Sequence, residues 1–219
     1  MKKVIIFDFD NTLVLSLADW KYMIDHETPK HYGVKENPDF EPKRHGLSNK
    51  DTAKFFLEMH PDVKVSHEEI VDYWYDYMAV KYKENIPLIE GTKEFLIALK
   101  NKGYKLVLAT ATGKKLLKRA FPVYDIDKYF DLILCEEEVG KSKREPDIYY
   151  KIMEQFGVKV EECLYFEDSC IAIKTASNLG IDCVAVVSDL NKHRQEFFDQ
   201  TCTMSIEKYS QDVIKKLSL

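Results

Sequence analysis

The chain has 219 residues, of which 45% are hydrophobic and 32% charged, with a formal net charge of −5. This balance is typical of a globular protein and excludes a disordered or fibrous chain. A nucleic-acid-binding protein usually carries a basic surplus, so we expect no nucleic acid and no membrane surface among the partners. The length is enough for one α/β domain with a smaller inserted domain.

The cysteines and the N-terminal segment indicate the cellular compartment in which the protein is expected. The five cysteines are odd in number and form no CxxC pair, which favours reduced, buried thiols and a reducing compartment. The first apolar run meets Asp8 and Asp10, which a signal peptide does not tolerate. No apolar stretch reaches the length of a membrane span. We therefore expect a cytoplasmic protein. A separate expectation is that it is a monomer or a weak homodimer.

The first predicted element is a buried strand over residues 3–8, which continues into Phe9, Asp10 and Asn11. Because side chains alternate on an extended chain, Asp8 and Asp10 point to the same side. In open α/β sheets, ligands bind beyond the carboxyl ends of the strands. Taken alone, the stretch also fits a hydrogen-bonded turn that follows a strand.

A helical insert is predicted over residues 15–87. About ninety-five residues separate the first strand from the next, against roughly thirty in a simple βαβ unit. Ser66 and Glu69 form a capping box, which predicts a long helix that ends near Glu84. The crossings near residues 14–17 and 84–90 suggest a lid that moves on a hinge.

Two shorter features of the insert also carry expectations. Ser16, three residues before Asp19, is expected to cap the first helix of the insert. Lys43, Arg44 and His45 are expected in a loop, where they would either meet an anionic substrate tail or form a solvated charge run.

The rest of the chain alternates between apolar runs and helical patterns. Continuous apolar runs are typical of buried parallel strands, and the alternation predicts a Rossmann-like parallel sheet with helices on both faces. The expected core is formed by residues 1–14 and 88–219. The expected strands lie at 104–110, 131–135, 163–167 and 182–187, and the expected helices near 91–102, 113–121, 146–156, 169–179, 191–199 and 205–217.

The strand at 163–167 also ends in acids, Glu167 and Asp168. A helix cap explains one acid well, but not four carboxylates at the ends of two strands. If the first and fourth strands are neighbours, this cluster is too negative to stand without a cation. Oxygen ligands and hard charge select Mg²⁺.

Two further strand-end positions allow more than one interpretation. Thr110 closes the second strand, but either it or Thr112 could cap the helix that follows. Lys143 follows the third strand and competes with Lys141, and either lysine could be an exposed loop residue. Together with Arg144, these lysines suit a site for anions.

In chain order, these motifs resemble those of the haloacid dehalogenase superfamily, in the phosphatase-type branch with a helical cap after the first strand. That branch includes proteins like phosphoglycolate phosphatase and β-phosphoglucomutase. The stretch DFDNTL resembles the first motif of the family. Thr110 resembles the second motif, and Lys143, three residues before Pro146, resembles the third. Glu167 and Asp168 resemble the fourth motif.

The resemblance implies a role for each motif residue. Asp8 is the implied nucleophile and Asp10 the general acid and base. Thr110 and Lys143 are the implied phosphoryl-binding side chains. The resemblance also implies that main-chain amides after Asp8 and Thr110 cradle the phosphoryl oxygens, which points to Phe9 and Ala111. The implied Mg²⁺ ligands are Asp8, the main-chain carbonyl of Asp10, Asp168 and, directly or through water, Glu167.

The activity that the resemblance implies is Mg²⁺-dependent hydrolysis of a small phosphorylated metabolite through an aspartyl-phosphate on Asp8. A β-phosphoglucomutase-like phosphomutase is the alternative. Mutase members carry Thr and His near the start of the cap, where this chain has Ser16 and Trp20, and this difference favours hydrolysis. A signalling module that keeps its phosphate on Asp8 would lack a cap of this size.

Overall fold

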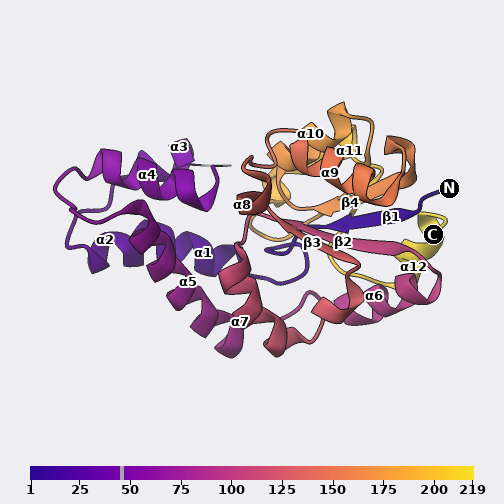
Figure 1. Cartoon of the computed structure of the whole chain (residues 1–219), viewed down its shortest axis with the longest axis horizontal. Coiled ribbons are helices and arrows are strands. Elements are labelled where there is room, and N and C mark those ends of the chain that lie inside the picture. Colours follow the sequence, from indigo (N-terminus) through magenta and orange to yellow (C-terminus); the bar gives the residue numbers. More distant parts are fainter. Residues whose placement is uncertain (45–46) are drawn as a thin grey trace.

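The computed structural model describes residues 1–44 and 47–219, so His45 and Gly46 lie outside the described residues. Six parallel strands form one sheet in the order β3-β2-β1-β4-β5-β6 (Figure 1). This sheet confirms the predicted Rossmann-like core. The strands are β1 Val4–Phe7, β2 Lys105–Thr110, β3 Leu132–Cys135, β4 Cys163–Glu167, β5 Asp182–Val186 and β6 Met204–Ile206.

Strand β1 lies at the centre of the sheet, between β2 and β4. Phe7 is in register with Leu108 of β2 and with Phe166 of β4. The amide of Asp8 then donates to the carbonyl of Phe166 at 3.1 Å. The first and fourth strands are therefore neighbours, and their acidic ends meet at one edge of the sheet.

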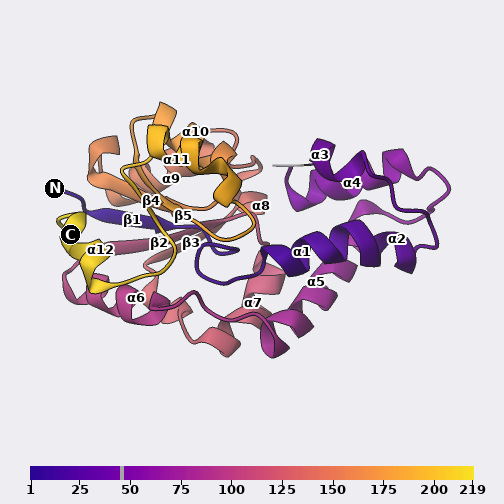
Figure 2. The ribbon, with the colours of Figure 1, turned by 180° about the vertical axis from the view of Figure 1, so that it is seen from behind.

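Helices cover both faces of the sheet, as the alternation predicted (Figures 1 and 2). Because side chains alternate along each strand, Phe7 packs in one buried cluster and Ile6 in the other. Helices α6, α7 and α12 contribute to the first cluster, and α9, α10 and α11 to the second. Their bounds are α6 Thr92–Asn101, α7 Lys114–Tyr124, α9 Asp147–Phe156, α10 Cys170–Asn178, α11 Gln195–Thr201 and α12 Gln211–Lys216.

The helices between β1 and α6 lie beyond the carboxyl end of the sheet (Figure 1). They are α1 Leu17–Tyr22, a π-helix over Met23–Glu27, α2 Thr28–His31, α3 Phe40–Arg44, α4 Asn49–Met59 and α5 His67–Glu84. Helix α5 begins with the predicted capping box of Ser66 and Glu69 and ends at Glu84, as expected. The boundaries of a separate cap domain at residues 15 and 87 stay a prediction.

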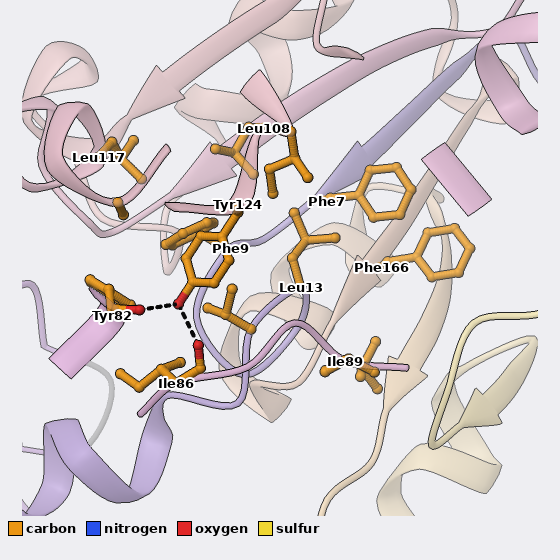
Figure 3. Close-up of a cluster of buried hydrophobic side chains, with 14 of the residues drawn as sticks. Phe7, Phe9, Leu13, Tyr82, Ile86, Ile89, Leu108, Leu117, Tyr124 and Phe166 are labelled. Atoms are coloured by element: carbon orange, nitrogen blue, oxygen red, sulfur yellow. Dashed lines mark hydrogen bonds between the residues drawn. The ribbon is translucent and has the colours of Figure 1, made fainter. Parts of the chain in front are cut away.

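The two chain crossings between this helical layer and the sheet run beside each other. The amide of Leu15 donates to the carbonyl of Pro87 at 3.0 Å, and the amide of Ile89 donates to the carbonyl of Leu13 at 2.9 Å. The buried cluster around them is drawn in Figure 3, where the Tyr124 hydroxyl donates to the carbonyl of Ile86 at 2.8 Å. The crossings are therefore held by backbone bonds and by apolar packing.

Three sequence-based expectations about elements are wrong. Residues 204–206 form β6 at the sheet edge, so helix α12 begins only after Ser210. Ser16 precedes α1, but its side chain makes no capping hydrogen bond. Lys43 and Arg44 end helix α3 instead of lying in a loop.

Within the described part of the chain, no helix is both long and apolar enough to cross a membrane.

Candidate active site

Three carboxylates from two strand ends meet beside a pocket. One oxygen from each of Asp8, Glu167 and Asp168 lies within 4.8 Å of the others. The pocket has a volume of about 590 Å³ and is lined from both the sheet and the helical layer. All three donors are carboxylate oxygens, which Mg²⁺ prefers.

Lys143 lies inside this cluster. Its Nζ donates to Asp8 Oδ1 at 2.7 Å and to Glu167 Oε2 at 2.7 Å, and its side chain is only 9% exposed. Lys141, the competing candidate, is exposed. The backbone amide of Lys143 donates to Glu136 Oε1 at 2.6 Å, which fixes the loop after β3.

Both oxygens of Glu167 are engaged by the protein. Oε2 accepts from Lys143 and from the Tyr165 hydroxyl. Oε1 accepts from the amides of Asp168 and Ser169, each at 3.0 Å. Tyr165 reaches Glu167 because residues two apart on a strand share a face. Glu167 is thereby held in one orientation.

The electrostatics follow from burial. Burial raises the pKa of Asp8 to about 8, against the opposing effect of Lys143. Burial and the Glu167 charge raise the pKa of Asp168 well above its usual value. Burial also acts to raise the pKa of Glu167, but Lys143 and the hydrogen bonds outweigh it and the pKa falls. Three carboxylates thus share one ammonium, and a divalent cation fits the remaining charge.

Asp10 is held by donors on both sides of the pocket. Its Oδ1 accepts from Ser16 Oγ at 2.6 Å, from Trp20 Nε1 at 2.9 Å and from the Tyr82 hydroxyl. Its Oδ2 accepts from the Thr112 hydroxyl. Three of these donors belong to the helical layer or the crossing that leads to it, and the fourth follows strand β2. The hydroxyl of Ser16 is thus used on Asp10 and not as a helix cap.

Thr110 and Ala111 lie at the end of β2, against the pocket. Thr110 is buried, and its Oγ1 accepts from the amide of Thr112 at 3.1 Å. Neither threonine caps α7, because the N-cap is Gly113. The capping alternative for both residues is therefore wrong.

Phe9 and Arg44 are placed differently from the motif acids. The side chain of Phe9 is fully buried in the cluster of Figure 3, so only its main chain can serve the pocket. Arg44 lines the pocket, but its Nε and Nη2 donate to the two oxygens of Asp25 at 2.9 Å each. Its charge is therefore already paired.

Sequence reasoning missed several residues that hold the site. Asn11 Nδ2 donates to Asp168 Oδ2 at 3.0 Å, and Asn191 Nδ2 donates to the carbonyl of Asp168 at 3.2 Å. Tyr82 reaches Asp10 from helix α5. Asn191 and Glu136 both follow strands, so a search for polar residues after every strand would have found them. Nothing in the sequence pointed to Tyr82.

Known proteins similar to this chain include phosphatases and a solved structure with the same fold. The phosphoglycolate phosphatase of Aquifex aeolicus is 30% identical over 184 residues, which is 81% of each chain. The phosphorylated carbohydrates phosphatase of Thermotoga maritima is 26% identical over 190 residues, 86% of this chain and 87% of the other. The structure of CbbY from Rhodobacter sphaeroides with phosphate has the same fold, with a TM-score of 0.82 and 22% identity over the whole of both chains.

A family model described as haloacid dehalogenase-like hydrolase matches residues 5–186, which span β1 to β5. That range includes both acidic strand ends and Lys143. The chain therefore belongs to the haloacid dehalogenase-like hydrolase family.

Proposed function

We propose that this hydrolase is a Mg²⁺-dependent phosphatase that carries the phosphoryl group on Asp8 during turnover. One observation carries the proposal: the Asp8 carboxylate lies 2.7 Å from the buried Lys143 ammonium, and both residues line a pocket that Asp10 also lines. The relatives named above as phosphatases support the reaction class.

The metal would be held by Asp8, Asp168 and the main-chain carbonyl of Asp10. Bound there, Mg²⁺ supplies positive charge that offsets the carboxylate nucleophile and the phosphoryl oxygens. Glu167 has both oxygens engaged by the protein, so we assign it to orienting Lys143 and the main chain of Asp168. Asn11 and Asn191 hold Asp168 in place.

In the first step, an Asp8 oxygen attacks phosphorus and the ester P–O bond breaks. Asp10 gives its proton to the leaving alkoxide oxygen, and Asp8 becomes an aspartyl-phosphate. Lys143 keeps the nucleophile beside a positive charge throughout. The Thr110 hydroxyl and the amides of Phe9 and Ala111 would donate to the phosphoryl oxygens.

In the second step, Asp10 takes a proton from water as the water oxygen attacks the same phosphorus. The Asp8–phosphate bond breaks, inorganic phosphate leaves, and both carboxyl groups return to their starting state. The covalent intermediate divides one difficult displacement into two easier ones. Asp10 serves both steps because it returns to the same protonation state after each cycle.

The substrate is proposed to be a small phosphorylated metabolite. A pocket of about 590 Å³ suits a molecule of metabolite size. The names of the relatives, which point to phosphoglycolate and phosphorylated carbohydrates, support the same class.

Release of phosphate from p-nitrophenyl phosphate tests the proposal. We expect turnover with Mg²⁺, its loss with excess EDTA, and a decrease of at least about a thousandfold in Asp8→Asn, since the nucleophile is gone. Circular dichroism checks that the variant is folded. Turnover that is independent of Mg²⁺, or that survives in Asp8→Asn, would contradict the proposal.

The phosphomutase alternative predicts different products. A phosphatase frees inorganic phosphate from a sugar phosphate, whereas a mutase returns an isomeric sugar phosphate. Phosphorus NMR of the reaction mixture separates the two outcomes. Trp20, at the position where mutase members carry His, donates its indole N–H to Asp10 and has no nitrogen that accepts a proton.

A further inference from the structure

The pocket continues past the carboxylate cluster to a short basic segment after β5. This segment is a 3₁₀ turn over Lys192–Arg194, and its residues His193 and Arg194 line the pocket. Lys192 lies outside the lining and pairs with Asp189 at 2.7 Å. From sequence, the run of Lys192, His193 and Arg194 favours a solvated helix face, but the structure separates its members.

The basic segment is anchored to the catalytic cluster. Asn191, the residue before it, is buried, and its Nδ2 donates to the carbonyls of Asp168 at 3.2 Å and Val186 at 2.9 Å. Its Oδ1 accepts from the amide of Ser188 at 2.7 Å. The amide of Arg194 donates to the carbonyl of Asn191 at 2.8 Å, so the backbone of the turn, though not the exposed Arg194 side chain, is held beside the pocket.

The cations on the opposite wall are already neutralised. Arg44 is bound by both oxygens of Asp25, and Lys21 lies 3.2 Å from Glu41. An anion that bound these residues would have to compete with a carboxylate that is already in place. Within the described ranges 1–44 and 47–219, the side chain of Arg194 has no hydrogen-bond or ion-pair partner, and Arg194 lines the same pocket.

We propose that Arg194, together with His193, binds a second anionic group of the substrate, a carboxylate or a phosphate, while the first phosphoryl group lies at Asp8. This inference rests on the proposed function and narrows its substrate class to phosphomonoesters with an acidic tail. Arginine suits this task because its planar guanidinium donates two parallel hydrogen bonds to either anion. Lys192, on the same turn, forms an ion pair with Asp189.

Binding to the Asp8→Asn variant with Mg²⁺ tests the inference without turnover. Isothermal titration calorimetry compares glycerol 3-phosphate, which has a neutral tail, with 3-phosphoglycerate and with propane-1,3-diol bisphosphate. At least one acidic probe is expected to bind about tenfold or more tightly than glycerol 3-phosphate, as a charge-assisted pair implies. A preference for 3-phosphoglycerate assigns a carboxylate tail, and a preference for the bisphosphate assigns a phosphate tail.

Arg194→Gln is expected to reduce that preference to less than about threefold, within the range of screened surface charges. Lys192→Gln removes a neighbouring charge of the same segment outside the pocket and is expected to keep the preference. Equal binding of all probes, binding of none, or an equal effect of the two substitutions would overturn the inference. Phosphate release by the wild type is measured separately, so failure of the inference is distinct from failure of the proposed function.

Discussion

Asp10 accepts hydrogen bonds from hydroxyl and indole groups that come from distant parts of the chain. Trp20 and Tyr82 belong to helices α1 and α5, while Thr112 follows strand β2. The Tyr82 hydroxyl also accepts from Trp20 Nε1 at 3.1 Å, so the two side chains support each other. Burial, with the neighbouring Asp10 charge, raises the pKa of Tyr82 well above its usual value, and the phenol stays a donor.

Tyr82→Phe tests whether this contact positions the acid. In the proposed first step Asp10 protonates the leaving oxygen, which an alkyl phosphate needs and p-nitrophenyl phosphate hardly needs. Loss of the hydrogen bond that orients Asp10 is expected to lower kcat/KM for glycerol 3-phosphate by about tenfold. The decrease for p-nitrophenyl phosphate is expected to be several times smaller.

Tyr124→Phe provides the matched control. Tyr124 lies in the same buried cluster and donates its hydroxyl to the carbonyls of Ile86 and Tyr82 (Figure 3). No hydrogen bond joins its side chain to Asp10. Tyr124→Phe should lower the free energy of unfolding by a similar amount. Any decrease in kcat/KM should be the same for glycerol 3-phosphate and p-nitrophenyl phosphate. Equal losses for both substrates in Tyr82→Phe, or the same selectivity in Tyr124→Phe, would show that Tyr82 acts through stability alone.

The residues of the site differ in how far sequence could predict them. Asp8 and Asp168 directly follow strands, and parallel strands bring their carboxyl ends to one edge, so the meeting of these two acids follows from the strand pattern. Lys143 is preferred to Lys141 only through the family resemblance. Tyr82 is 72 residues from Asp10 in the sequence and lies in the last turn of α5, among aromatic residues that fit core packing equally well. Its role depends on how α5 docks, which no local pattern encodes.

The junction between α6 and the C-terminal segment depends on a glycine. Gly91 is the N-cap of α6 with φ +80°, and a Cβ there would lie 2.2 Å from the carbonyl oxygen of Tyr209. The two backbone segments are also bonded to each other beside this glycine, because the amide of Tyr209 donates to the carbonyl of Glu90 at 2.9 Å. Neither backbone segment can therefore move aside without losing this hydrogen bond.

Gly91→Ala is expected to lower the free energy of unfolding by about 3 kcal/mol, from the left-handed backbone and the collision together. Gly103→Ala shares the positive φ, at +88°, but has nothing within 4 Å of the new Cβ. We therefore expect that variant to lose only about 1 kcal/mol. Urea unfolding measures both, and equal losses would contradict the proposed collision.

Among the helices and strands, the sequence predicted those that a local residue pattern specifies. The capping box at Ser66 and the apolar runs of the first five strands are of this kind. Strand β6 has only three residues and exists because it pairs with β5, so Met204–Ile206 alone looked like the start of a helix. Ser16 has the sequence of a cap, but the Asp10 carboxylate takes its hydroxyl.

Across the whole molecule, the helical layer and the sheet are joined at several points. The crossings pair with each other, and the cluster of Figure 3 continues from Phe7 in the sheet to Tyr82 in α5. On the exposed surface, Lys115 of α7 pairs with Asp72 of α5 at 2.7 Å. Because Asp10 is bonded from both parts, its orientation depends on their relative placement. Opening of the helical layer as a lid stays a prediction.

The central claim is that Asp8 carries the phosphoryl group, and mapping of the labelled site tests it most directly. Wild-type protein is mixed with p-nitrophenyl phosphate that carries ³²P, quenched in acid and digested with trypsin. The account predicts label on the peptide of residues 4–21, which contains Asp8, and no label on that peptide in Asp8→Asn. Label on any other peptide, or turnover by Asp8→Asn at the wild-type rate, would contradict it.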